Sequence, residues 1–260
     1  AVNPAAEAAD VAICFSIDNP AGSGKGRVNE KREAGALRGL VMSDPTLAAT
    51  DDLRGDFTLA ALGGGEVSIW RGWPRGRWWN SPMLFWDQFA AEGRLGEEPA
   101  DMGPTGAVSV RRTIPAGGRA EFTFVVAWHF PNRTPERCGW HAAKGHGKTV
   151  IGNHYATRFA GSWQAAEHLD RSLAALEQRT RAFTTAMQKA TLPGAVKDAA
   201  MSNLSTLATT TSFRTADGEF HGFEGVNDKV GCCYGSCTHV WNYETATAFL
   251  FPTLARSLRQ

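Results

Sequence analysis

The residues that could do chemistry are concentrated in one short stretch of the chain, residues 220–243. Glu224 lies there between Phe223 and Gly225, and three cysteines, two histidines and several aromatic residues surround it in the sequence. An acid between an aromatic ring and a glycine can be partly desolvated, and the glycine lets a ligand approach the backbone closely. We therefore predict that this stretch contains the functional site.

The first chemistry that this stretch could perform is glycoside hydrolysis with Glu224 as the nucleophile. A retaining glycosidase uses two carboxyl groups, one that attacks the anomeric carbon and one that protonates the leaving oxygen. The nucleophile must be ionised and shielded from bulk water, and a Phe-Glu-Gly turn at the end of a strand can meet both conditions. The alternative is that Glu224 is an ordinary solvated glutamate in a hairpin.

The second chemistry is zinc binding. Thiolates and imidazole are preferred zinc ligands, and the candidate ligands here are Cys232, Cys233, Cys237 and His239. Adjacent cysteines point in different directions, however, and no C-x-x-C knuckle accompanies them. We therefore favour free cysteines that pack as small apolar side chains, and we expect neither a metal nor a cofactor.

Tryptophan suggests a third function. The chain has 9 Trp, five of them between Trp70 and Trp86. The face of an indole ring matches the apolar face of a pyranose, so a Trp-rich β-sandwich could be a carbohydrate-binding module without catalytic activity. The alternative is that these side chains are core residues of a large sheet domain, because buried aromatic residues dominate protein cores.

Composition and charge exclude several classes of partner. The 260 residues are 43% hydrophobic and 20% charged, as is usual for a soluble globular protein. The net charge of +1 gives no reason to expect a nucleic-acid partner, and no apolar run approaches the ~18–20 residues of a membrane span. The 5 cysteines make a poor disulfide framework, which favours a cytoplasmic protein, although no targeting segment identifies the localisation.

The first part of the chain, residues 1–157, has the pattern of an antiparallel β-sandwich. Short alternating runs such as Val11–Ile17 are separated by Gly and Pro turns. Residues 22–32 are predicted to be a polar, glycine-rich loop. The runs within 108–128, on either side of a Pro-Ala-Gly-Gly turn, are predicted to form a hairpin. Residues 85–97 could instead form a short helix.

After residue 158 the hydrophobic period changes from two to about 3.6, which indicates helices. We expect one helix to begin at Ser162, with the Ser162 side chain as its cap, and another to follow Pro193. Residues 209–224 have the pattern of a strand and its return strand. Pro252 must kink or restart the last helix, because proline has no backbone N–H to donate.

The order of these elements indicates a multi-domain α+β chain. Strands come first and helices second, which suggests two packed domains rather than a doubly wound sheet. We place the β-sandwich domain at residues 1–157 and the helical domain at 158–260. Residues 131–157 form a long polar connection, and a connection of that length is usually functional or crosses between domains.

Several motifs, spread over about half of the chain, resemble one family of enzymes. They are F-E-G-V-N-D-K-V-G-C-C-Y-G-S-C-T-H-V-W-N-Y at 223–243, F-L-F-P-T-L-A-R-S-L at 249–258, A-W-H-F-P-N-R at 127–133, G-N-H-Y-A-T-R-F at 152–159 and F-S-I-D-N-P-A-G at 15–22. The chain resembles glycoside hydrolase family 116, which includes the non-lysosomal glucosylceramidase (bile-acid β-glucosidase). The resemblance implies an N-terminal β-sandwich, the first helices of an (α/α)6 barrel, and retaining β-glycosidase activity.

The resemblance also implies roles for single residues. Glu224 matches the family's nucleophile, and His239 falls where the glucosylceramidase branch has an aspartate that contacts the glucose. Trp241 and Asn242 crowd the same region, so all three are expected to bind the substrate. That substrate is expected to be a β-glycoside, by default a glucoside, with a glycolipid as one option. The family's acid/base aspartate comes later than Gln260, so we expect this N-terminal piece to be inactive alone. We also expect the β-sandwich domain to be truncated at its start.

Overall fold

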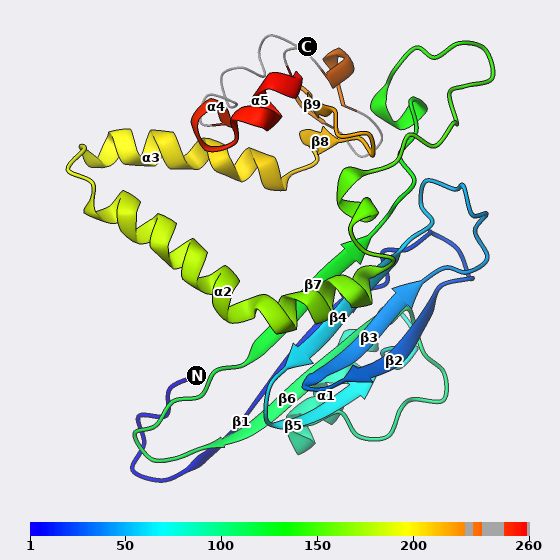
Figure 1. The fold of residues 1–260 in the computed structure, drawn as a ribbon. Helices are drawn as coiled ribbons and strands as arrows, with labels where there is room; N and C mark the ends of the chain where they lie inside the picture. Colours follow the sequence, from blue (N-terminus) through cyan, green and yellow to red (C-terminus); the bar gives the residue numbers. More distant parts are fainter. Residues whose placement is uncertain (227–230, 236–246, 259–260) are drawn as a thin grey trace. The chain divides into compact units, whose positions relative to one another are not determined.

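A computed structural model of the chain describes residues 1–226, 231–235 and 247–258. The chain divides into two compact units. The first unit consists of Ala1–His129 and Gly161–Arg171, and the second of Phe130–Ala160 and Ser172–Gln260. The long helix α2 (Ser162–Lys189) begins in the first unit and continues in the second (Figure 1). The domain boundary that the sequence suggests at residues 157 and 158 stays a prediction.

The first unit contains two antiparallel sheets (Figure 1). The three-stranded sheet has the order β1-β6-β5, and its strands are β1 (Ala9–Asp18), β5 (Glu66–Trp70) and β6 (Thr105–Ile114). The four-stranded sheet has the order β2-β3-β4-β7, and its strands are β2 (Val28–Ala34), β3 (Leu37–Ser43), β4 (Asp56–Leu62) and β7 (Thr123–His129).

The two sheets pack face to face through alternating side chains. Leu59 of β4 and Leu40 of β3 are fully buried in one cluster with Val108 of β6. Successive residues of a strand point to opposite faces, so Ala60 of β4 belongs to a second cluster on the other face of the four-stranded sheet. The period-two pattern in the sequence therefore predicted the antiparallel, β-rich first part of the fold correctly.

The beginning of α2 covers this other face of the four-stranded sheet. Trp163 and Ala166 are buried there. The backbone N–H of Ser162 donates to the carboxylate of Asp56 on β4 at 2.6 Å, and the Ser162 hydroxyl lies 2.7 Å from Thr58 Oγ1. An acid is favourable at this position because the first N–H groups of a helix have no partner within it. The Ser162 hydroxyl, which we expected to cap the helix, contacts the sheet.

The helix α1 (Ser81–Glu92) packs against the outer face of the three-stranded sheet. Phe85 and Phe89 are one helical turn apart, and their rings stack with centroids 5.8 Å apart. The helix ends at Gly93, whose left-handed backbone (φ 61°) suits a residue without a Cβ. The short helix that the sequence predicts over residues 85–97 is confirmed, but it both begins and ends earlier, at Ser81 and Glu92.

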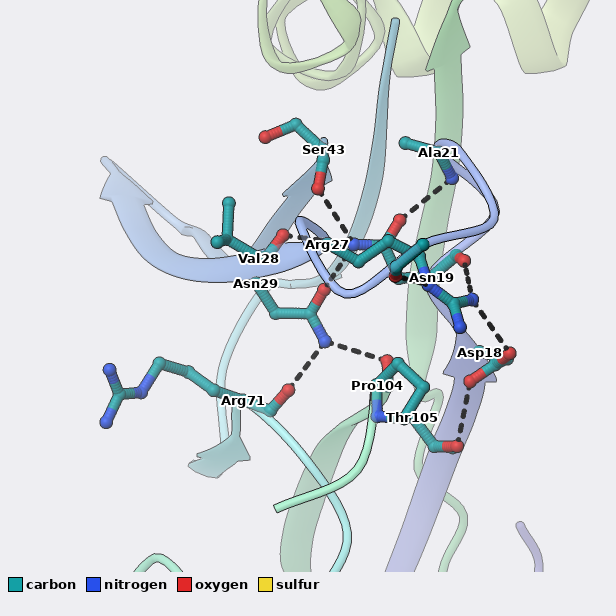
Figure 2. A network of polar contacts seen from close by, with 11 residues as sticks. Asp18, Asn19, Ala21, Arg27, Val28, Asn29, Ser43, Arg71, Pro104 and Thr105 are labelled. Atoms are coloured by element: carbon teal, nitrogen blue, oxygen red, sulfur yellow. Dashed lines mark hydrogen bonds and ion pairs between the residues drawn. The ribbon is translucent and has the colours of Figure 1, made fainter. Parts of the chain in front are cut away.

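The Asp-Asn-Pro-Ala-Gly turn after β1 connects both sheets through the side chain of Asn19 (Figure 2). Asn19 is only 1% exposed. Its Oδ1 accepts from the N–H of Ala21 at 2.8 Å, and its Nδ2 donates to the carbonyl of Ser43 at 3.1 Å and to Asn29 Oδ1 at 2.9 Å. The amide of Asn29 then donates to the carbonyl of Pro104 at 2.9 Å, just before β6. Because a buried amide without partners is costly, this network fixes the corner between the sheets.

The hairpin predicted within residues 108–128 is wrong, although both of its strands exist. β6 pairs with β1 and β5, whereas β7 pairs with β4 in the other sheet. Both edges of β6 are occupied, so the Pro-Ala-Gly-Gly turn carries the chain from one sheet to the other. The loop predicted over 22–32 is also too long, because β2 begins at Val28 and pairs with β3.

The second unit contains short helices and a two-stranded ribbon (Figure 1, green to red). Its elements after α2 are α3 (Gly194–Ser202), η3 (Asn203–Ala208), β8 (Ser212–Arg214), β9 (Phe220–Gly222), η4 (Cys233–Gly235), α4 (Thr247–Leu250) and α5 (Pro252–Leu258). Before α2 lie η1 (Glu136–Cys138) and η2 (His154–Thr157). The strand pair within 209–224 and the helical restart at Pro252 are both confirmed. The (α/α)6 barrel stays a prediction.

Candidate active site

The two-stranded ribbon of β8 and β9 leads directly to Glu224. Phe213 of β8 is paired with His221 of β9 across the ribbon. After β9 the backbone stays attached, because the N–H of Phe223 donates to the carbonyl of Thr211 at 2.8 Å. The ribbon therefore fixes the backbone as far as the residue before Glu224.

The side chains below Glu224 form a buried aromatic cluster. Phe223 is 2% exposed and packs with Phe213 and Cys138. The Phe213 ring lies 5.0 Å from the ring of Phe223 and 5.0 Å from the ring of His221. Neighbouring residues of an extended chain point in opposite directions, and Glu224 is accordingly exposed. The carboxylate is thus accessible although the residue before it is anchored in a core, and the described residues do not shield it from bulk water as the sequence led us to expect.

Arg133 stabilises this cluster from the 131–157 connection. Its guanidinium carbon lies 4.2 Å from the centroid of the Phe213 ring, which is a close cation–π contact. Its Nε donates to Asn153 Oδ1 at 2.6 Å, and the amide of Asn153 donates to the carbonyl of Phe130 at 2.8 Å. No local pattern in the sequence marks Arg133 as a functional residue, although the A-W-H-F-P-N-R motif contains it.

A short turn returns the chain to Glu224. The N–H of Cys232 donates to the carbonyl of Gly225 at 2.9 Å, and its thiol lies 3.8 Å from Glu224 Oε2 as a weak donor. An ideal Cβ on Gly231 would lie 2.1 Å from the Phe223 ring, so only glycine fits there. No described atom lies within 4 Å of an ideal Cβ on Gly225. The turn is therefore tight against the aromatic cluster and open beside Glu224.

Burial of the His221 imidazole favours its neutral form. Burial lowers the pKa of His221 below its ordinary value, and the charge of Arg133 lowers it further. The carboxylates of Glu219 and Asp217 oppose this shift. A neutral ring is suited to the position that His221 occupies between aromatic side chains, where its centroid is 4.9 Å from that of Trp140.

The structure brings together only some of the residues predicted to form the site. Glu224 and Cys232 are in contact. His239, Trp241, Asn242 and Cys237 lie outside the described residues, as does the side chain of Cys233. Within the part of the chain that is described, no group of three or more His, Cys, Asp or Glu side chains is arranged to hold a metal ion. The zinc hypothesis and the substrate-binding roles therefore stay predictions.

Some of the tryptophans are buried and others are exposed, and a sugar-binding role of the exposed ones stays a prediction. Trp70 and Trp163 are core residues with 2% exposure each. Trp78 and Trp79 are 90% and 91% exposed, and both have left-handed backbones (φ 52° and 61°). Trp86 on α1 is 60% exposed. The core explanation is thus correct for some tryptophans and wrong for others.

Fold and site together define a class of protein. A domain of two antiparallel sheets comes first in the chain, and short helices and a β-ribbon follow it. The exposed carboxylate of Glu224 comes directly after that ribbon. Residues 1–178 match the family described as beta-glucosidase 2, glycosyl-hydrolase family 116 N-term. The match covers more than half of the 260 residues, and the chain therefore belongs to glycoside hydrolase family 116, as its motifs indicated. A search of curated proteins gives no match.

Among the described residues, no helix is both long and apolar enough to cross a membrane.

Proposed function

We propose that this protein is a retaining β-glycosidase, of the β-glucosidase or glucosylceramidase type, with Glu224 as its nucleophile. Membership of family 116 supports glycosidase activity in general. The observation that carries the specific role is the position of Glu224, exposed at the end of a ribbon whose preceding residue, Phe223, is 2% exposed. The family match ends at residue 178, so the role of Glu224 rests on this geometry and on its sequence motif.

The proposed reaction has two displacements. A carboxylate oxygen of Glu224 attacks the anomeric carbon, the bond to the leaving oxygen breaks, and a second carboxyl group protonates that oxygen. Water, deprotonated by the same second group, then cleaves the glycosyl ester and regenerates Glu224. The two carboxyl groups of a retaining enzyme are about 5–5.5 Å apart.

The chain supplies two properties that such a nucleophile needs. The anchoring of Phe223 among Phe213 and Cys138 holds the backbone next to Glu224 in place, which limits the positions that the carboxylate can take. The thiol of Cys232 is a weak donor 3.8 Å from Glu224 Oε2, so the carboxylate has one contact from the turn that returns the chain to it. Among the described residues, no atom lies within 4 Å of an ideal Cβ on Gly225, which favours the approach of a sugar ring from that side.

The remaining parts of the proposal concern the domain and the substrate. We place a β-sandwich domain at 1–157 and the first helices of an (α/α)6 barrel at 158–260. We assign sugar binding to His239, Trp241 and Asn242. The proposed substrate is a β-glucoside, which includes glycolipids with a β-linked glucose.

Covalent labelling tests the role of Glu224. The full-length protein is incubated with 2,4-dinitrophenyl 2-deoxy-2-fluoro-β-glucoside, whose good leaving group makes acid catalysis unnecessary for the first step. Mass spectrometry should find one fluoroglucosyl group on the peptide that contains Glu224. The E224Q variant should stay unlabelled, because an amide is a poor nucleophile. As a matched control, E219Q alters an acid at the turn of the same ribbon and should be labelled normally. A label that persists in E224Q would assign the nucleophile to another residue.

A further inference from the structure

Tyr234 has an unusual backbone for a tyrosine. Its φ of 55° and ψ of 14° lie in the left-handed region, which non-glycine residues seldom adopt because the Cβ is crowded there. Its side chain is 58% exposed, so core packing does not explain why an aromatic residue occupies this position. Strained residues of this kind are concentrated at functional sites.

Two consecutive residues of the 131–157 connection hold Tyr234 in place. The indole N–H of Trp140 donates to the backbone carbonyl of Tyr234 at 2.8 Å. The imidazole Nε2 of His141 lies 3.2 Å from the Tyr234 hydroxyl, and the two rings have centroids 5.5 Å apart. Backbone and side chain of Tyr234 are therefore fixed at the same time, by groups that are adjacent in the sequence.

The same ribbon supports Tyr234 and Glu224. Trp140 packs on His221 of β9 with ring centroids 4.9 Å apart. An ideal Cβ on Gly235 would lie 3.3 Å from the Cβ of His221, so the chain passes directly over β9 at this point. Cys232, which contacts the Glu224 carboxylate, is two residues before Tyr234. Tyr234 and Glu224 are thus both attached to the same ribbon, and Tyr234 follows closely after the residue that contacts the Glu224 carboxylate.

We propose that Tyr234 contacts the glycoside substrate next to Glu224, and that Trp140 and His141 are the positioning residues that hold it there. The proposal rests on the proposed function of Glu224. The exposed ring offers an apolar face to a pyranose or to the leaving group, and the phenol can exchange a hydrogen bond with a sugar hydroxyl. Because the ring is already fixed, binding loses little side-chain entropy. The contact stabilises bound substrate and transition state alike, so its loss should raise KM and leave kcat nearly unchanged.

A glycine at position 234 tests the contribution of the tyrosine side chain without changing the backbone of the turn. Glycine adopts a φ of 55° without strain, so Y234G removes the ring and the phenol while the turn is retained. In the full-length enzyme, Y234G should raise KM for a β-glucoside about tenfold with kcat within about twofold, as expected for the loss of one aromatic contact. H141A should raise KM by a smaller factor, because the ring remains but is no longer held.

A pair of tyrosines provides the matched control. Y234F removes one hydroxyl at the site, and Y155F removes the Tyr155 hydroxyl, which donates to the carbonyl of Phe130 at 3.0 Å in the same unit. Y234F should raise KM about threefold to fivefold, whereas Y155F should lower only the melting temperature. If Y234G proves unstable, this pair decides in its place.

The outcomes separate this proposal from the proposed function. A raised KM in Y234G, with Glu224 still labelled by the fluoroglucoside at a high probe concentration, supports the contact. A KM within twofold of wild type in both Y234G and Y234F overturns the contact, while loss of the label in E224Q keeps the role of Glu224 intact. Labelling of a residue other than Glu224 overturns the proposed function, and with it the assignment of Tyr234 to the nucleophile's site.

Discussion

The guanidinium carbon of Arg133 lies 4.2 Å from the centre of the Phe213 ring, and this contact joins the long connection to the ribbon that carries Glu224. Arg133 also donates to Asn153 at 2.6 Å. R133A should lower the free energy of unfolding by about 2 kcal/mol, because it removes a cation–π contact and a charged hydrogen bond together. R133K should lower it by about 1 kcal/mol, since lysine keeps the charge but not the planar donor group.

Denaturant unfolding of the two variants checks this prediction. Arg158 is the control, because its guanidinium also lies over an aromatic ring, that of Phe159, but at 5.6 Å and on an exposed side chain. R158A should change the free energy of unfolding by less than about 0.5 kcal/mol. Equal effects of R133A and R158A would show that the Arg133–Phe213 contact does not stabilise the ribbon.

The ribbon should also make stability depend on pH through His221. Its pKa in the folded protein is lowered from the ordinary value of 6.5, first by burial. The unfolded chain therefore binds a proton at a higher pH than the folded chain does. The contribution of His221 to stability is complete above about pH 6.5 and is lost as the pH falls from there toward the folded-state pKa.

The H221F variant measures this contribution. Phenylalanine keeps a ring between Phe213 and Trp140 but cannot bind a proton. Between about pH 7.5 and pH 5.5, H221F should lose less free energy of unfolding than the wild type does. The other histidines titrate in both proteins, so the difference reports on His221. Parallel curves for the two proteins would mean that the pKa of His221 is the same in the folded and the unfolded chain.

Local patterns in the sequence were sufficient for much of the fold. The alternation from Val11 to Ile17 and the break at Pro252 depend on neighbouring residues, and both were predicted correctly. The pairing of strands was not predictable in this way. A Pro-Ala-Gly-Gly turn shows that the chain reverses, but not that both edges of β6 are already occupied by β1 and β5. β2 was missed because most of its side chains are exposed and show no apolar alternation.

The candidate site, like the strand pairing, was predictable only where its features depend on neighbouring residues in the sequence. Glu224 could be proposed as the nucleophile from its immediate neighbours, Phe223 and Gly225, because that argument uses only local features of the sequence. Arg133 and Trp140 were not assigned to the site, because their roles come from contacts with Phe213 and His221, far along the chain. Contacts between distant segments leave no period or spacing in a single sequence.

Two glycines beside Glu224 should respond differently to the addition of one methyl group. An ideal Cβ on Gly231 would lie 2.1 Å from the Phe223 ring, whereas no described atom lies within 4 Å of one on Gly225. G231A should therefore displace Phe223 and lower the free energy of unfolding by about 1–3 kcal/mol. G225A should leave the free energy of unfolding within about 0.5 kcal/mol of wild type.

Labelling with the fluoroglucoside distinguishes the functional effects of these glycines. G231A should slow labelling at saturating probe, because the carboxylate next to Phe223 is displaced from its position. G225A should instead require a higher probe concentration, because the methyl group occupies space through which the sugar approaches. Identical stability and labelling for both variants would contradict the tight packing of the turn against Phe223.

The exposed pair Trp78 and Trp79 should limit the stability of the fold. Both have left-handed backbones, with φ of 52° and 61°, and both indoles are at least 90% exposed, so they gain little from burial. A left-handed backbone costs an L-residue about 1–2 kcal/mol, and glycine avoids this cost but loses about 0.5–1 kcal/mol in chain entropy. W78G should therefore raise the free energy of unfolding by about 0.5–1 kcal/mol.

The control is W86G on α1, where the indole is 60% exposed but the backbone is helical. Glycine there should lower the free energy of unfolding by about 1 kcal/mol. Thermal unfolding of both variants should shift the midpoint in opposite directions, and a decrease in both would show that the Trp78 backbone is not strained.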